Sequence, residues 1–362
     1  MILLRSFHES VSVRRIAAVI AVSLLALIGQ RSSAQSVFQS LPFSLFERYL
    51  EALRVQAGIP GMSALILRDG VIVWERGFGR AEIERAIDAT PSTPYQIGSL
   101  SQAIGATLLL KVCVDEGFDT VNDRIGIWSP FAAEADSTVA QLLGHVSAIG
   151  AYKYDLARVA AVTPAIEACT GTSFQQSVAH EIFTRLGMID SVPGTALGAP
   201  TAADMQQFGP ANLNRYGATL ARIAAPYRVD TKGRASRTDQ VPSRANAATG
   251  LVTTARDLAR FDVGLRSSIL LRPETQLRAW SPVGFGFPTG LGWFVQTYNG
   301  SPVVWQFGVI PDAYSSLMLK LPTRGLTLIL LANSDALVPQ TLDRGDVTAS
   351  VFARTFLRVY VP

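Results

Sequence analysis

Charged residues are scarce in this chain of 362 residues: Asp, Glu, Lys and Arg together make up 17%, and there are only four lysines. The formal net charge is +4, and residues 1–34 carry +3 of it, as Arg5, Arg14, Arg15 and Arg31 against Glu9. The rest is nearly neutral and lacks the basic surface that nucleic-acid binding requires. A hydrophobic content of 48% excludes a disordered chain and indicates a sizeable core.

Histidine and cysteine are also rare, with three and two residues. Neither His145 nor His180 belongs to a metal-spaced group, so we expect no metal and no cofactor. Cys113 and Cys169 both lie in apolar, helix-like contexts. An oxidising compartment would allow them to pair, but buried free thiols are the more common fate of isolated cysteines in apolar stripes.

The first 34 residues have the pattern of an export signal. Arg14 and Arg15 precede a 13-residue apolar run, Ile16 to Ile28, and small residues follow at positions 32–34. A bilayer span needs roughly 20 residues, so an uncleaved anchor is the weaker interpretation. We expect a signal peptide over 1–34, a mature start near Gln35, no later transmembrane segment, and a periplasmic or secreted protein.

Alternating apolar residues and turn signals predict strands near both ends of the sequence. Two strands are expected over 62–68 and 71–77, joined at Asp69-Gly70, and four more over 290–298, 302–308, 313–321 and 326–333. A helix is expected over 99–116, ended by Gly117, another from about Thr254, and a closing one over 347–359. Residues 228–247 are polar and predicted to form a loop.

This order predicts an α+β fold: an antiparallel sheet flanked by helices, with a mainly helical insertion. We expect one mature domain over 35–362, with sheet-forming halves at about 35–125 and 250–362 and the insertion at about 126–249.

Several segments together resemble one family. YQIGSLSQAIGATLLLKVCVDEG, IPGMSALILRDG, LLGHVSAIGAYKY, SFQQSVAHEIFTRLGM, GLVTTARDLARF and GLGWF follow one another as in the serine β-lactamase and penicillin-binding-protein family. The likeness covers nearly the whole mature chain and is greatest to class C β-lactamases, D-alanyl-D-alanine carboxypeptidases and related esterases. It implies a β-lactamase/transpeptidase-like fold and an acyl-enzyme mechanism.

The family's three motifs keep one residue each and lose their partners. Ser-x-x-Lys aligns with Ser99 to Gln102, so the lysine is replaced by glutamine. Tyr-x-Asn aligns with Tyr154 to Leu156, and Lys- or His-x-Gly aligns with Gln306-Phe307-Gly308. The resemblance therefore implies Ser99 as nucleophile, Tyr154 as proton carrier, the backbone N–H groups of Ser99 and Val309 as oxyanion hole, and a substrate-binding strand at Gln306, Phe307 and Gly308.

The replacements remove the charged groups that would activate the serine. The Gln102 amide cannot act as a base near neutral pH. A tyrosine has an unperturbed pKa of about 10 and needs nearby cations to lower it. Lys111 lies about 18 Å along the helix from Ser99, which leaves Lys153 as a possible proton-relay substitute. Adjacent residues usually point apart, so Lys153 in solvent is the alternative.

Other candidates have ordinary structural interpretations. Ser99 could merely begin a helix, and Ser101 is expected to pack on the other side of it. His145 is expected to make a structural hydrogen bond, and His180 to lie on the surface. Trp305 and Phe307 fit either a pocket wall or the core.

Two functions remain open. The first is an exported serine hydrolase that acts on an amide or ester through Ser99 and is inefficient against β-lactams. The second is an inactive relative that binds a peptidoglycan-like peptide, a β-lactam or a protein partner in the same cleft. We expect a small-molecule or peptide substrate or ligand first of all, and the sequence does not give the oligomeric state.

Overall fold

The structure is a computed structural model that describes residues 43–130 and 132–361. The chain divides into two units, residues 1–49 and 50–362. Within the first, residues 43–49 are helical, and the helix continues to residue 56. The expected signal segment 1–34 lies outside the described residues. All the elements below belong to the second unit.

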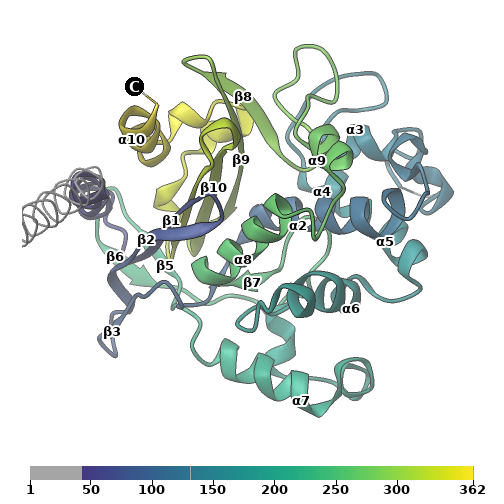
Figure 1. Ribbon diagram of the computed structural model, residues 1–362. Helices are drawn as coiled ribbons and strands as arrows, with labels where there is room; N and C mark the ends of the chain where they lie inside the picture. Colours follow the sequence, from purple (N-terminus) through teal and green to yellow (C-terminus); the bar gives the residue numbers. More distant parts are fainter. Residues whose placement is uncertain (1–42, 131, 362) are drawn as a thin grey trace, which may run out of the picture. The chain divides into compact units, whose positions relative to one another are not determined.

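A seven-stranded antiparallel sheet in the order β3-β2-β1-β11-β10-β9-β8 is the centre of this unit (Figure 1). Strands from both ends of the sequence meet where β1 pairs with β11, with Met62 opposite Ala332. The bounds of these strands are β1 Gly61–Arg68, β2 Val71–Glu82, β3 Ile87–Asp88, β8 Phe294–Tyr298, β9 Ser301–Ile310, β10 Tyr314–Leu321 and β11 Leu326–Ala332. The predicted α+β architecture is confirmed.

Both faces of the central strands are covered. Every residue of β10 and β11 is buried, as expected for strands packed on both sides. Helix α8 (Ala255–Arg266) contacts β1 and β11, and α2 (Ser101–Leu109) contacts β9. Figure 1 shows both on one side of the sheet and α10 (Val351–Tyr360) on the other. Helix α8 begins where predicted, because the Thr254 hydroxyl accepts a hydrogen bond from the Asp257 N–H.

Most of the helices lie between the two strand-forming ends of the sequence, and α10 follows the last strand. The α-helices are α2 Ser101–Leu109, α3 Val139–Leu143, α4 Leu156–Ala160, α5 Thr163–Thr170, α6 Phe174–Val178, α7 Ala202–Leu220, α8 Ala255–Arg266, α9 Pro273–Ala279 and α10 Val351–Tyr360. Two π-helical segments, η2 Leu110–Val114 and η5 Ala179–Thr184, continue α2 and α6. The 3₁₀ segment η1, Gly98–Leu100, precedes α2. The helix predicted over 99–116 is thus three segments in succession.

Two expectations need correction. The segment 228–247 is not only loop, because β5 (Tyr227–Val229) and β6 (Ala235–Arg237) form a small hairpin there. Cys113 and Cys169 are not free thiols: they form a disulfide with Cα atoms 5.6 Å apart. This bridge joins η2 to α5, two elements that are distant in sequence and packed against each other.

Strand β9 continues past its neighbour and meets the start of the α2 helix. Strand β8 pairs only with residues Ser301–Trp305 of β9, so the following residues have a free edge beside η1. A Cβ placed on Gly308 would lie 1.9 Å from the Ile97 carbonyl oxygen, a distance that only glycine avoids. The Ser316 hydroxyl on β10 donates to the same carbonyl at 2.8 Å. This contact positions Ser99 against the sheet.

Candidate active site

Ser99 lies in η1, beside the free edge of β9. Its Oγ donates to the Phe307 carbonyl oxygen at 3.3 Å, and its hydroxyl is near enough to Tyr154 to lower the pKa of that phenol. Ser99 is only 2% exposed. The adjacent Ser101 donates to the Gly98 carbonyl at 2.7 Å and is fully buried, which agrees with the packing role expected of it. The fold therefore brings Ser99, Phe307 and Tyr154 together from three segments that are distant in sequence.

The backbone N–H groups of Ser99 and Val309 lie at the same edge of β9. The N–H of Ser99 lies in the first turn of η1, where such groups have no partner within the helix. The carbonyl and the N–H of Phe307 both point away from β10. In a strand, the backbone polar groups of every second residue point to the same edge. The N–H of Val309 consequently faces this edge too, and a Cβ on Gly98 would lie 3.0 Å from the Val309 nitrogen.

Gln102 connects Tyr154 to a buried histidine. Its Nε2 donates to the Tyr154 hydroxyl at 3.1 Å, and its Oε1 accepts from His145 Nε2 at 2.9 Å. His145 Nδ1 in turn accepts from the Asp155 N–H at 3.1 Å. These bonds define a neutral chain that runs from His145 through Gln102 to Tyr154, whose hydroxyl lies near Ser99. Sequence reasoning missed the contact between Gln102 and His145.

Burial keeps both titratable members of this chain uncharged. It lowers the pKa of His145 to about 4, with hydrogen bonding to Asp155 a smaller, opposing effect. It also raises the pKa of Tyr154 to about 12, although hydrogen bonds with Ser99 and Gln102 oppose the rise. The nearby Asp343 carboxylate adds to that rise. At neutral pH Tyr154 is therefore a phenol and His145 a neutral imidazole.

An aromatic cluster surrounds Tyr154. Phe307 stacks on its ring at 5.4 Å, Phe294 at 6.0 Å, and His145 lies 4.4 Å away, all between ring centroids. Trp305 stacks on Phe294 at 4.3 Å and is fully buried, so it belongs to the core rather than to an open wall. The wall beside the serine is consequently apolar, and Phe307 is its member on β9.

The third-motif glutamine and the residue after the tyrosine motif have structural partners. Gln306 is buried; its Nε2 donates to the Gly292 carbonyl and its Oε1 accepts from the Phe307 N–H, each at 2.9 Å. Leu156 begins α4, whose first turn is capped by the Asp155 side chain. No sequence pattern predicts the contact between Gln306 and Gly292.

Lys153 does not act with Tyr154 in this geometry. Its side chain is exposed, and among the described residues no hydrogen bond or ion pair joins it to Tyr154. Only its backbone is engaged: its N–H donates to the His145 carbonyl and its carbonyl accepts from Arg158. The exposed side chain favours the alternative in which Lys153 points to solvent, because consecutive residues of an extended segment point to opposite sides. His180 is also exposed, as expected.

Neither metal nor membrane signals appear in the part of the chain that the structure describes. Within residues 43–130 and 132–361, no group of three or more His, Cys, Asp or Glu side chains is arranged to hold a metal ion. No helix in the same residues combines the length and the apolar character that crossing a bilayer requires.

A family model described as "Beta-lactamase" matches residues 46–351, most of the chain. The protein belongs to this family. Curated relatives include "Protein flp" of Staphylococcus aureus (strain NCTC 8325 / PS 47), 30% identical over 97 residues, which are 25% of this chain and 19% of that protein. The match thus spans about a fifth of that relative's length. The "Putative penicillin-binding protein PbpX" of Bacillus subtilis (strain 168) is 24% identical over 282 residues, 74% of this chain and 69% of that protein.

Solved structures show the same fold. A penicillin-binding protein homologue from Pyrococcus abyssi, described as octameric, has a TM-score of 0.66 at 18% identity, covering 84% of this chain and 76% of the other. The D-amino acid amidase of Ochrobactrum anthropi SV3 has a TM-score of 0.63 at 19% identity, with coverages of 86% and 99%. Membership of the Beta-lactamase family supports a serine hydrolase-like function, and these solved structures show the fold alone.

Proposed function

We propose that Ser99 is a slow acyl-transfer nucleophile that acts on activated esters and turns over β-lactams or peptides poorly. The observation that carries this proposal is the neutral chain from His145 through Gln102 to Tyr154, which ends near the Ser99 hydroxyl without a basic group. Losing a positioned base costs on the order of 10²–10⁴ in rate. An activated ester, with its better leaving group, tolerates that loss better than an amide.

In the proposed reaction Tyr154 relays a proton without becoming a phenolate. The Ser99 oxygen forms a bond to the ester carbonyl carbon while its proton passes to the Tyr154 oxygen. The phenolic proton of Tyr154 passes to the leaving alkoxide as the C–O bond breaks. The N–H groups of Ser99 and Val309 stabilise the oxyanion. Water then attacks the acyl carbon and passes a proton to the Tyr154 oxygen. The phenolic proton of Tyr154 passes to the Ser99 oxygen as its bond to the acyl carbon breaks, and the carboxylic acid leaves.

A second candidate is a cleft that binds a ligand without turnover. The burial of Ser99, at 2% exposure, and the stacking of Phe307 on Tyr154 favour it, because both limit the approach of a carbonyl to the hydroxyl. We also propose that the protein is exported. The signal-like segment 1–34 and the Cys113–Cys169 disulfide support this, since disulfides persist in oxidising compartments.

Intact-mass spectrometry after incubation with a fluorophosphonate or with penicillin G separates the candidates. We expect a fluorophosphonate adduct that is absent from Ser99→Ala and retained in Ser101→Ala, the adjacent buried serine. Turnover of p-nitrophenyl acetate should likewise depend on Ser99, and nitrocefin turnover should be far slower. Saturable binding of penicillin G with no adduct from either probe would support the second candidate, and fast nitrocefin turnover would contradict both.

A further inference from the structure

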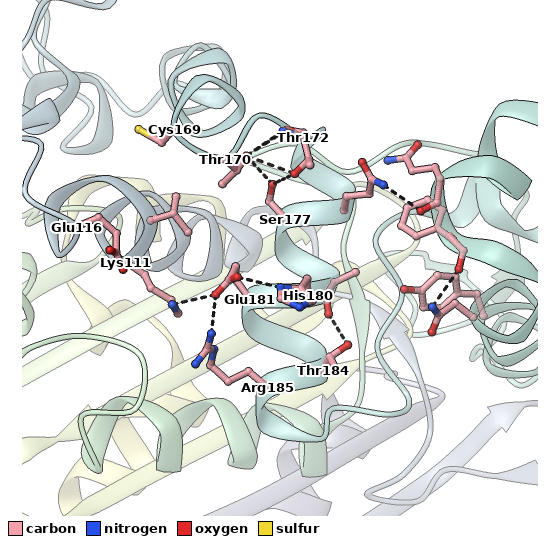
Figure 2. A pocket seen from close by; sticks show the side chains of 17 residues that line it. Lys111, Glu116, Cys169, Thr170, Thr172, Ser177, His180, Glu181, Thr184 and Arg185 are labelled. Carbon is pink, nitrogen blue, oxygen red and sulfur yellow. Dashed lines mark hydrogen bonds and ion pairs between the residues drawn. The ribbon is translucent and has the colours of Figure 1, made fainter.

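A separate pocket of about 620 Å³ lies in the helical part of the molecule, away from Ser99 (Figure 2). Its walls come from η2, the end of α5, α6 with η5, and α7. The two π-helical segments of the described chain, η2 and η5, both contribute to it. Such π segments are rare and frequently mark functional sites. The volume is within the range of small-molecule sites, roughly 300–1,000 Å³.

One side of this pocket is charged but internally neutralised. Figure 2 shows Lys111 and Arg185 converging on Glu181, at 2.9 and 3.0 Å. Burial alone would raise the pKa of Glu181, but Lys111, His180 and Arg185 outweigh it and lower that pKa to about 2. With Glu116 also in the wall, two cations face two carboxylates. A charged ligand therefore gains little net Coulomb attraction here.

Three residues of the lining, Gln176, Gln207 and Asn212, carry side-chain amides. Gln176 donates through Nε2 to the Gln207 carbonyl at 3.0 Å, and Asn212 through Nδ2 to the Phe208 carbonyl at 3.0 Å. Gln207 donates through Nε2 to the Ser173 hydroxyl. Each amide is thus held by its nitrogen, and no partner within the described residues engages its side-chain oxygen. Three oriented acceptors favour a ligand that carries several O–H donors.

An aromatic pair forms the apolar part of the wall. Phe208 and Tyr216 meet edge to face with ring centroids 5.6 Å apart. They stand on either side of the kink in α7, where Gly209 has φ = 70° and Pro210 follows. The positive φ requires glycine and redirects the helix, so that both of its halves reach the pocket.

We propose that this pocket binds a neutral polyhydroxylated ligand, of the size of a disaccharide, through the amide oxygens of Gln176, Gln207 and Asn212. A cation would face Lys111 and Arg185, and an anion would have to compete with Glu181 for them. Sugar hydroxyls satisfy the amide acceptors without carrying charge, and the apolar face of a pyranose ring suits the aromatic pair. The inference is independent of the chemistry at Ser99.

Saturation-transfer NMR and titration calorimetry on the mature protein would test this. The probes are maltose and N,N′-diacetylchitobiose, with glucosamine and glucuronate as cationic and anionic counterparts. We expect binding of at least one neutral disaccharide and weaker binding of both charged sugars. Loss of one hydrogen bond in Asn212→Ala should weaken it about three- to tenfold. Asn214→Ala, an exposed neighbour on α7 outside the pocket wall, is the matched control.

The Ser99→Ala variant should bind the disaccharide as the native protein does, which separates this pocket from the proposed acyl-transfer site. A failure of both neutral disaccharides to bind the folded protein would overturn the proposal. So would stronger binding of a charged sugar, or affinity that Asn212→Ala and Asn214→Ala leave equally unchanged. The melting temperature of each variant confirms that it is folded.

Discussion

The Ser99 site and the buried face of α8 hold polar side chains in two different ways. On α8, Asp262 pairs with Lys320 of β10, both at most 5% exposed, and Thr327 donates to the same carboxylate at 2.9 Å. At the site, Gln102 and His145 are equally buried but carry no charge, and they satisfy each other by hydrogen bonds. The fold therefore accommodates a buried lysine where it supplies a carboxylate. No described carboxylate hydrogen-bonds Gln102.

The largest loss of stability is expected from breaking the buried Asp262–Lys320 ion pair. Asp262→Ala would leave the Lys320 ammonium buried without its partner, which typically costs about 3–5 kcal/mol of unfolding free energy. Urea denaturation measures this. Asp136→Ala is the control, because its pair with Arg124 is exposed, its backbone has no positive φ, and such pairs contribute about 0–1 kcal/mol. Equal losses in the two variants would contradict the distinction between buried and exposed pairs.

At the Ser99 site, the stability contributed by the neutral His145 should depend on pH. The pKa of His145 is about 4 in the folded protein and near 6.5 in an unfolded chain, so below 6.5 the unfolded state binds a proton that the folded state does not. Stability from this group is full above pH 6.5 and declines as the pH falls towards 4, by on the order of 3 kcal/mol.

The His145→Asn variant provides the matched comparison for this pH dependence. Asparagine tolerates the positive φ of 59° at this position and does not titrate. The variant is expected to be less stable than the native protein at pH 7, with a difference that narrows at lower pH. Unfolding free energies measured at pH 7, 5.5 and 4 test this, and parallel curves would show that His145 does not stay neutral in the fold.

Local sequence patterns predicted most of the sheet but missed several elements outside it. The strands and the Asp69-Gly70 turn were predictable because alternation and turn residues act over a few positions, and the Thr254 cap for the same reason. Helix α9 and the β5–β6 hairpin were missed, since both are short and largely polar in sequence. The Cys113–Cys169 bridge was misjudged because it depends on how η2 packs on α5.

The candidate site divides in the same way. Ser99, Gln102, Tyr154 and Phe307 could be placed together by resemblance, and the structure brings them together. The loss of the charged motif residues was visible in the sequence. The bond between Gln102 and His145 spans 43 residues and has no local signal, so this contact could be deduced only from the structure. The exposure of Lys153 likewise depends on the side to which the side chains of its extended segment point.

The smallest expected effect, and the sharpest test of the comparison, is that of Gln102→Lys. A lysine here would be buried beside neutral partners, and burial without a carboxylate lowers the pKa of an amine. Part of it would therefore be unprotonated near pH 8 and able to accept the Ser99 proton. We expect p-nitrophenyl acetate hydrolysis to rise at least about tenfold, which corresponds to about 1.4 kcal/mol of barrier. The rate should increase with pH through the amine's pKa.

Gln102→Met, which also loses the His145 hydrogen bond but adds no amine, separates the effect of the added base from the effect of the lost contact. If the folded lysine variant gains no more than the methionine variant, the site lacks more than a base, and binding without turnover becomes the better account.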